Sequence, residues 1–396
     1  MDLTRSEIQQ FINSNLNADI SELILKYADV DGIPIREIAD QISSKNKAKT
    51  KVPTWFKVDG LIYPPPISME QCSSDETGSF KSKLFSGRKA LDLTGGAGID
   101  SYFLSHSFQQ VDYVEIDSKL VKVCKYNFTL LNVHNVHFHC FSAEDFLNDT
   151  KDTYDLIYVD PSRRIDKKKV FKLGDSSPDI IGMQEDLIER GQDILIKTSP
   201  FLDIHKTLFD LQKVKEVYII GIRNEVKEVL YHLSGKINSR LEPLLISVNI
   251  TTSGHYQSFK HLPSEESICE VVFKEPTVGE YIYEPNSSLL KSGAFKLSAN
   301  RWGLAKFHSN THLNISNEIH EDYPGRIFRI KEIYQSIKKG MNSLKGRQLN
   351  IIARNSRLKP EELKKKLKTL DGGEEYLIAA RTISEGTKLF YCDRIK

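Results

Sequence analysis

The stretch LDLTGGAGID, residues 91–100, has the composition of a loop that holds a ligand through its backbone. An apolar strand runs into Asp92, and Gly95, Gly96 and Gly98 follow before a helical pattern begins. Glycines at such a turn let the backbone approach a ligand and direct the first N–H groups of the helix toward it. The spacing does not fit the G-x-G-x-x-G dinucleotide fingerprint. A carboxylate at Asp92 suits a ligand with an ammonium group, although a tight turn can also form without any ligand.

Acidic residues recur at the ends of the next three strand-like segments. Glu115 ends the second strand, Glu144 and Asp145 follow the third, and Asp160-Pro161 close the fourth. An acid about one βα unit after a glycine turn can bind both hydroxyls of a ribose. One polar strand end proves little, but four in succession are much rarer by chance and predict a binding edge.

The elements that must position these residues alternate between strand and helix. Strands are expected at 89–94, 111–117, 136–141, 154–160, 193–199, 215–222 and 244–250, and helical patterns at 118–131 and 183–191. This alternation predicts an α/β fold with a Rossmann-like, doubly wound parallel sheet. Ligands bind such sheets beyond the carboxyl ends of the strands, where the polar residues lie.

The flanking segments have other patterns. Apolar residues at helical spacing predict an N-terminal helical segment, which ends in the lysine-rich stretch 43–56. We interpret that stretch as a connector, more as a solvated linker than as a nucleic-acid contact. Beyond residue 267 we expect a strand at 268–273, a strand and helix within 280–298, and a strand, helix and strand within 324–384. The predicted domains are 1–60 (helical), 61–270 (α/β), and two small α+β modules, 271–322 and 323–396.

Bulk composition excludes several classes of protein. The chain has 396 residues, a net charge of +2 and 39% hydrophobic residues, which is typical of a multidomain globular protein. No stretch approaches the roughly 18 apolar residues of a membrane span, and the N-terminus lacks a signal-peptide pattern. The five cysteines are scattered without a C-x-x-C pair, so neither a disulfide framework nor a metal site is expected. We therefore expect a cytoplasmic protein with no membrane partner.

Charge is distributed unevenly along the chain. Residues 323–396 contain 18 Lys and Arg against 8 Asp and Glu, so this segment carries an excess of ten positive charges. Such an excess predicts contact with a polyanion. The alternative is that the lysines within 360–370 form only the solvated face of a helix.

The four strand-end motifs resemble, in order and spacing, those of class I S-adenosylmethionine-dependent methyltransferases. Asp92, Gly96 and Gly98 match the first motif, although Thr94 stands where that motif has its first glycine. The resemblance covers roughly residues 84–250. A narrower resemblance, carried by residues 63–85, 283–296, 323–328 and 351–382, is to a bacterial methyltransferase family with a ferredoxin-like segment and a THUMP-like domain. The polar and aromatic stretch 63–85 would cover the cofactor or the substrate.

This resemblance implies S-adenosyl-L-methionine as cofactor and assigns roles by motif. Asp92 would lie near the methionine amino group, and Glu115, beside Ile116, would hold the ribose. The backbone of the glycine loop would pass the methionine and ribose, and the third strand end would border the adenine; these residues are Thr94, Gly95, Gly96 and Gly98, and Ala143 to Asp145. Asp160 would stand between the sulfonium and the substrate.

The attacking atom can be partly judged from the residues after the fourth strand. No cysteine lies between Phe141 and Ile268, which disfavours methylation of a pyrimidine carbon. The sequence Asp160-Pro161-Ser162-Arg163 partly resembles the D-P-P-Y/F/R motif of nucleic-acid amino methyltransferases. Asp160, Pro161 and Arg163 are therefore the catalytic candidates, with Arg163 either stacking on a base or only surface charge. Lys197 and Arg164 are left without an assigned role. Arg164 is consistent with surface charge. Lys197 is either a solvated strand cap or a side chain that opens toward the same crevice as Asp160.

The resemblance and the basic C-terminal segment together predict a methyltransferase that modifies a nitrogen of a nucleotide in structured RNA, tRNA or rRNA. THUMP domains generally bind RNA, and phosphate contacts would supply affinity. The alternatives are a methyltransferase of proteins or small molecules, and a cofactor-binding protein that has lost transfer activity.

Overall fold

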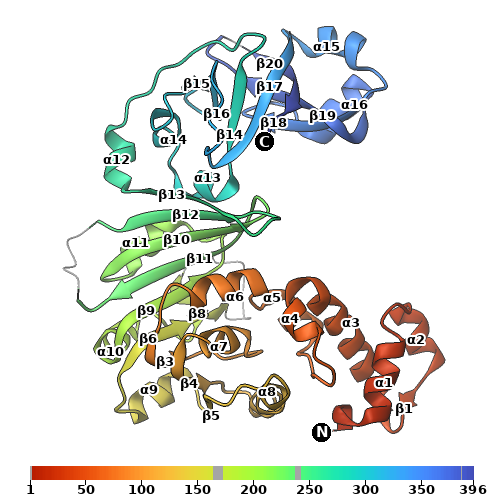
Figure 1. Ribbon diagram of the computed structural model, residues 1–396, viewed down its shortest axis with the longest axis vertical. Helices are drawn as coiled ribbons and strands as arrows, with labels where there is room; N and C mark the ends of the chain where they lie inside the picture. The colour runs from red at the N-terminus through yellow and green to blue at the C-terminus, as the bar shows by residue number, and fades with distance from the viewer. Residues whose placement is uncertain (1, 164–172, 237–241, 385) are drawn as a thin grey trace. The chain divides into compact units, whose positions relative to one another are not determined.

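The computed structural model describes residues 2–163, 173–236, 242–384 and 386–396 (Figure 1). The chain divides into two compact units. Unit 1 comprises Met1–Lys215 and Leu230–Leu241, and unit 2 comprises Glu216–Val229 and Glu242–Lys396. Among the described helices, none has the length and apolar character that crossing a bilayer requires.

The sheet of unit 1 contains five parallel strands in the order β9-β6-β3-β4-β5. They are β3 (Gly87–Asp92), β4 (Phe108–Val114), β5 (Val136–His139), β6 (Tyr154–Val159) and β9 (Gly191–Thr198). The chain winds from β3 to one side through β4 and β5, and then to the other through β6 and β9. The strand order therefore reverses between β3 and β6, where such sheets bind their ligands. This confirms the predicted Rossmann-like, doubly wound sheet.

Helices join these strands, as the alternating pattern predicts. They are α7 (Ile99–Leu104), α8 (Ser118–Leu130), α9 (Ala143–Asp149), α10 (Gln184–Arg190) and α11 (Ile204–Asp210). The centres of β3, β6 and β9 are almost fully buried, and their sequences are correspondingly continuous apolar runs. A short ribbon of β7 (Ser162–Arg163) and β8 (Ser176–Ser177) follows β6, with the single turn η2 (Leu173–Asp175) beside it.

Helices form the N-terminal part of unit 1, as predicted. They are η1 (Asp2–Thr4), α1 (Ser6–Ser14), α2 (Ile20–Lys26), α3 (Ile35–Lys51), α4 (Pro53–Phe56), α5 (Pro66–Gln71) and α6 (Asp75–Ser82), with the small hairpin β1 (Asp29–Val30) and β2 (Ile33–Pro34).

The prediction of a lysine-rich connector at 43–56 is wrong, because this stretch forms the end of α3 and all of α4. Lys45 is only 3% exposed and donates to Asn13. Lys47 forms an ion pair of 2.8 Å with Glu70, and Lys51 donates to the carbonyl of the same residue. Lysine stems can cover apolar surface while their ammonium groups reach polar partners. Lys45 thus joins α3 to α1, and Lys47 and Lys51 join α3 to α5, so the stretch is not a solvated linker.

Unit 2 is built on a seven-stranded sheet in the order β15-β16-β14-β17-β20-β19-β18. The strands are β14 (Tyr281–Pro285), β15 (Ala305–His308), β16 (Thr311–Ser316), β17 (Gly325–Tyr334), β18 (Gln348–Arg354), β19 (Leu370–Arg381) and β20 (Thr387–Arg394). The helices are α12 (Pro263–Ile268), α13 (Ser287–Ser292), α14 (Leu297–Asn300), α15 (Ile337–Leu344) and α16 (Pro360–Leu367). In a separate part, β12 (Leu244–Ile250) pairs in parallel with β10 (Val214–Ile222) and antiparallel with β13 (Tyr256–His261). The residues of β11 (Glu225–Ser234) are divided between the units.

The C-terminal elements agree with the predicted α+β character, with one correction. The strand expected at 268–273 is wrong: α12 ends at Ile268, and only Phe273 forms a single bridge, with Lys306. Its pairing is confined to Lys306 of β15, whose N–H donates to the carbonyl of Val272 over 2.8 Å and whose carbonyl accepts from the N–H of Lys274 over 3.0 Å. The sheet runs without interruption across residue 323, because β14 pairs with β17.

Candidate functional site

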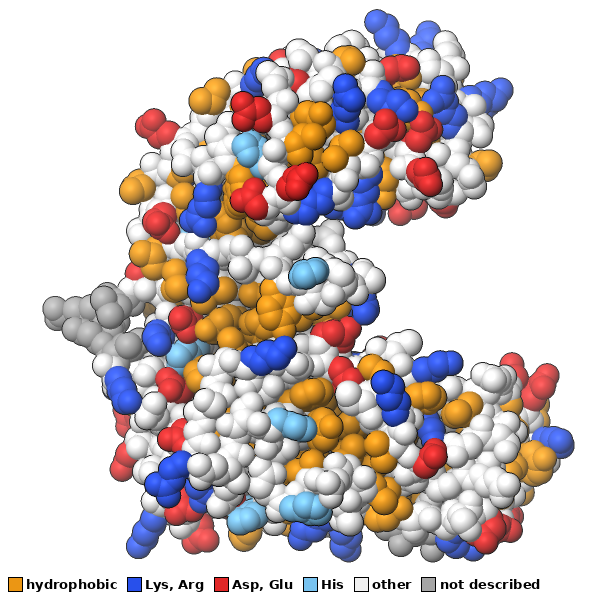
Figure 2. All heavy atoms as spheres, in the orientation of Figure 1, with side chains coloured by type: hydrophobic (Ala, Val, Ile, Leu, Met, Phe, Trp, Pro, Cys, Tyr) orange, Lys and Arg blue, Asp and Glu red, His pale blue; other side chains and the backbone are white. Residues whose placement is uncertain are grey.

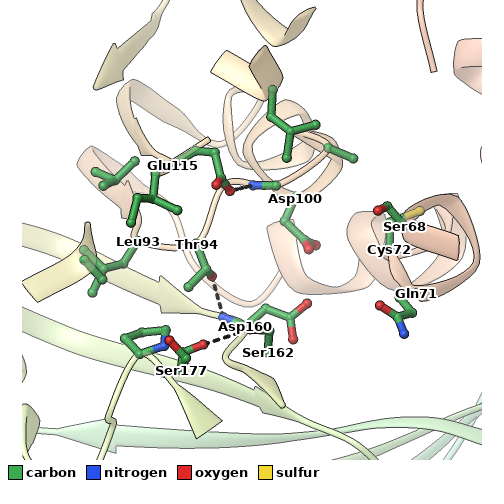
Figure 3. Close-up of a pocket in the computed structure, with 18 of the residues that line it drawn as sticks. Ser68, Gln71, Cys72, Leu93, Thr94, Asp100, Glu115, Asp160, Ser162 and Ser177 are labelled. Atoms are coloured by element: carbon green, nitrogen blue, oxygen red, sulfur yellow. Dashed lines mark hydrogen bonds between the residues drawn. The ribbon is translucent and has the colours of Figure 1, made fainter. Parts of the chain in front are cut away.

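A cavity of about 360 Å³ lies at the carboxyl ends of β3, β4 and β6 in unit 1. Its lining comes from the glycine loop, from the residues after the strands, and from the segment around α5 (Figure 3). Most of the strand-end residues that the sequence singles out meet here; the cavity is lined by Thr94, Gly95, Gly96, Glu115, Ile116, Ala143, Glu144 and Asp160.

The glycine loop is shaped by two different requirements. A Cβ on Gly95 would lie 2.2 Å from the ring of Tyr113, so only glycine fits against that buried side chain. Gly98, the N-cap of α7, has φ of 82°, a left-handed conformation that favours glycine. The N–H of Gly96 is directed at Glu115 and donates to its Oε2 over 2.9 Å. The loop thus turns its backbone toward the cavity and toward a carboxylate.

Glu115 follows β4, and both of its carboxylate oxygens are positioned by backbone groups. Oε2 accepts from Gly96, and Oε1 accepts from the N–H of Asp117 over 2.9 Å. Ile116 is 72% exposed beside it and lines the cavity as an apolar surface. A carboxylate next to an apolar side chain suits a ribose and the base attached to it.

Glu115→Ala is expected to weaken binding of S-adenosylhomocysteine by about 1–3 kcal/mol, the usual cost of losing a hydrogen bond to a charged group. Titration calorimetry on the purified protein measures this loss. Glu144→Ala, which removes a second carboxylate at the same cavity, is the matched control and should cost less. If both variants lose the same binding free energy, the negative charge at the cavity, and not a hydrogen bond to Glu115, determines the affinity.

Asp92 lies beneath the cavity, because its side chain is fully buried and does not line it. Its carboxylate accepts from the hydroxyl of Ser101 over 2.5 Å and from the N–H of Thr94 over 3.2 Å. Burial raises the pKa of Asp92 to about 7, and the neighbouring carboxylates of Asp100 and Asp160 contribute. Asp92 therefore shapes the loop, and its predicted position near the methionine amino group remains a prediction.

The raised pKa of Asp92 gives the unliganded protein a pH-dependent stability. The neutral form is favoured in the folded state, so this stabilisation is complete below about pH 4 and is lost as the pH rises through about 7. Asp92→Asn should therefore gain stability relative to the parent between pH 5 and pH 8, by a few kcal/mol at most. Thermal unfolding at both pH values measures the difference. The exposed control Asp149→Asn should show no such trend, and parallel pH profiles for Asp92→Asn and the parent would contradict the assignment.

The third strand end offers an apolar face and a capped helix. Ser142 is the N-cap of α9: its hydroxyl accepts from the N–H of Asp145 over 3.0 Å and donates to the Asp145 carboxylate over 2.7 Å. Ala143 lines the cavity, whereas Asp145 is exposed and does not line it. Phe141, which the sequence patterns did not single out, is 46% exposed and lines the cavity. It offers an aromatic surface on the side where the adenine is predicted.

Asp160 follows β6, and its backbone is tied to the glycine loop. Its N–H donates to the hydroxyl of Thr94 over 2.7 Å (Figure 3). The Thr94 side chain therefore links the end of β3 to the end of β6. The Asp160 carboxylate borders the cavity and is one-third exposed. Ser162, also in the lining, donates to the carbonyl of Ser177 over 3.2 Å.

The other catalytic candidates are placed only in part. Pro161 follows Asp160 but does not line the cavity. The backbone of Arg163 lies in β7, and its side chain is outside what the structure describes. Arg164 lies outside the described residues altogether. The roles of Pro161 and Arg163 therefore stay predictions.

The stretch 63–85, which the resemblance expects to cover the cofactor or the substrate, contributes four residues around α5 to the cavity lining: Ser68, Gln71, Cys72 and Ser73. The resemblance marks the stretch as a whole, but it assigns no role to these individual residues. Cys72 matters for the chemistry, since it brings to the cavity a thiol that the chain after β6 does not supply. This thiol donates to the carbonyl of Met69, and burial raises its pKa to about 11, so it is neutral at neutral pH.

Within the described parts of the chain, no group of three or more His, Cys, Asp or Glu side chains is arranged to hold a metal ion. His139, from the histidine-rich strand β5, instead lies 3.4 Å from Asp112, at its Nε2 atom.

Comparison with known proteins gives a full-length relative. The crystal structure of a candidate methyltransferase from Porphyromonas gingivalis W83 is 30% identical, with a TM-score of 0.86 and 98% of each chain covered. A ferredoxin-like domain model matches residues 281–324, and a THUMP domain-like model matches residues 325–394. A candidate methyltransferase from Streptococcus mutans, solved with SAH, is 14% identical over 40% of this chain and 96% of its own, with a TM-score of 0.29, too low to support an argument. No match was found among curated proteins.

Proposed function

Because the chain belongs to the bacterial family of class I S-adenosylmethionine-dependent methyltransferases with ferredoxin-like and THUMP-like C-terminal domains, we propose that it methylates a nitrogen of a nucleotide in structured RNA. The observation that carries the choice of nitrogen is Asp160. Its carboxylate borders the cavity at the strand order reversal and can accept a hydrogen bond from an amino group.

The residues of the cavity fit the cofactor. Glu115 offers carboxylate oxygens for ribose hydroxyls, and Ile116 and Phe141 offer apolar surface for an adenine. The glycine loop brings backbone close to the same place. When bound, S-adenosylmethionine supplies an electrophilic methyl group on a sulfonium.

The chain's own part in the reaction is to position the target and exclude water. Transfer of the methyl group to the target nitrogen would release S-adenosylhomocysteine and leave the nitrogen with a proton to lose. The nitrogen then loses a proton, which passes to water or to Asp160. Asp160 orients the amino group by accepting its hydrogen bond, and the neutral thiol of Cys72 is a poor nucleophile for the alternative route through a pyrimidine carbon.

RNA is proposed as the substrate because of the THUMP domain-like region and its charge. Lys and Arg side chains are visible over α15 and α16, with acidic side chains among them (Figure 2). Lys338, Lys339, Lys365 and Lys366 on these helices are exposed. Exposed lysines on packed helices can contact phosphates and supply affinity without base specificity.

The direct test is transfer of labelled methyl from S-adenosylmethionine to total RNA isolated from cells that lack the gene. RNA from cells that carry the gene is the control, since its sites would already be methylated. The proposal expects label in the first RNA and little in the second. Label that enters only protein or small molecules would support the alternative substrate classes, and cofactor binding without any transfer would support a protein that has lost activity.

A further inference from the structure

A buried lysine adjoins the proposed catalytic carboxylate. Strands β6 and β9 are parallel neighbours with Val159 opposite Ile196, so Lys197 lies beside Asp160 at the end of the sheet. The Lys197 Nζ atom is 2.5 Å from Asp160 Oδ2, and the two side chains are 11% and 33% exposed. Lys197, whose role the sequence leaves open, is thus a largely buried partner of Asp160 and not a solvated strand cap.

The ammonium group of Lys197 is also held from the opposite side. It lies 3.4 Å from the hydroxyl of Ser73, which comes from the segment after α5. Ser73 in turn donates to Asp100 Oδ2 over 2.8 Å and accepts from Lys81 over 2.7 Å. A second ion pair, of 2.7 Å, joins Lys81 to Asp100.

Asp100 shows how strongly charges interact in this cluster. Burial alone would raise the pKa of its carboxyl, but the charges of Lys81 and Lys197 hold that pKa below its usual value. Each lysine therefore has a carboxylate partner, and Lys197 cannot move away from Asp160 without leaving a buried charge poorly compensated. Ser73 and the charge of Asp100 thus hold the ammonium group of Lys197 in place. Lys197 can in turn hold the carboxylate of Asp160 in one orientation.

Fixing Asp160 through one oxygen leaves the other for the cavity. Lys197 takes Oδ2, and within the described residues no protein group donates to Oδ1. The backbone of Asp160 is held separately by Thr94. A carboxylate with one oxygen held by a cation and the other unoccupied is a directional hydrogen-bond acceptor. It suits a target that offers an N–H donor and disfavours an anionic one.

We propose that Lys197 is a positioning residue for methyl transfer, which holds Asp160 Oδ2 so that Oδ1 accepts a hydrogen bond from the amino group to be methylated. This inference rests on the proposed methyl transfer to nitrogen. A misplacement of about 1 Å at a reacting group can lower the rate about 100-fold, so the loss of Lys197 should act on turnover. A merely structural ion pair would instead lower stability and leave the turnover of folded protein unchanged.

The test uses Lys197→Met, Lys197→Arg, Asp160→Asn and the double variant Asp160→Asn/Lys197→Met, with exposed Lys206→Met as the matched control. Transfer of labelled methyl is measured into an extract of cells that lack the gene, with and without ribonuclease. Calorimetric affinity for S-adenosylhomocysteine and thermal unfolding identify variants that fail to fold.

We expect Lys197→Met to lower kcat about 100-fold with little change in KM for the cofactor, and Lys197→Arg to restore part of it. Because Lys197 acts through Asp160, the double variant should be no slower than Asp160→Asn alone. Additive losses in the double variant, or parental kcat in folded Lys197→Met, would overturn the proposal. If the labelled methyl groups remain in the product after ribonuclease treatment, RNA is not the substrate. The comparison of the single and double variants on that labelled fraction would still decide the role of Lys197.

Discussion

Asp160→Asn is expected to lower methyl transfer by about 10²–10⁴-fold, the range typical of a positioned proton acceptor. Asparagine keeps the size of the side chain but loses the charge that binds both Lys197 and the target amino group. Single-turnover transfer from labelled cofactor measures the loss. Affinity for S-adenosylhomocysteine should stay near the parental value, because the backbone bond from Asp160 to Thr94 remains. The unfolding temperature should fall, because the largely buried Lys197 loses the charge of Asp160, so turnover is compared on folded protein.

The control for this variant is Asp149→Asn, an exposed carboxylate in the same unit. If Asp160 only capped the turn after β6, asparagine, itself a good cap, would leave transfer almost unchanged. Near-parental turnover of Asp160→Asn on the true substrate would thus remove Asp160 from the reaction.

Reversing the charge of Lys365 and Lys366 on α16 is expected to lower the affinity for RNA about tenfold or more. Both side chains are exposed, and each lysine that no longer binds a phosphate should reduce the salt slope of log affinity by about 1. Filter binding of total tRNA between 50 and 200 mM salt measures both quantities, and the slope should fall by about 2.

Lys364 provides the matched control for this pair. It lies in the same helix but forms an ion pair with Asp371, so Lys364→Gln should change the salt slope little. Equal slopes for the charge-reversed variant and the parent would support the alternative that these lysines form only a solvated helix face. Deletion of residues 323–396 is a poorer experiment, because it would remove β17, the strand that pairs with β14 in the same sheet, and would so disturb the residues that remain.

The sequence predicts the sheet of unit 1 well because parallel strands buried on both faces are continuous apolar runs. It does not predict β11, since the usual hairpin signal is missing. Arg223 and Asn224, between β10 and β11, have φ of 50° and 68°, the left-handed values that a tight turn commonly takes from Asn-Gly. The stretch 43–56 is wrongly predicted as a connector, because a run of lysines gives no sign that Lys45 is only 3% exposed or that Lys47 and Lys51 bind Glu70.

The sequence predicts those residues of the candidate site that directly follow the parallel strands. Glu115 and Asp160 meet at one cavity because each follows a strand of the same sheet. Ser73 and Cys72 could not be found in this way, since they reach the cavity from a helical segment that no strand register places. The roles of the individual residues remain predictions.

The most direct test of the central claim is a comparison of nucleosides by mass spectrometry in total RNA from cells with and without the gene. We predict that one N-methylated nucleoside disappears without the gene, returns with the parental gene, and does not return with Asp160→Asn. Identical nucleoside profiles in all of these cells would contradict methylation of RNA by this protein.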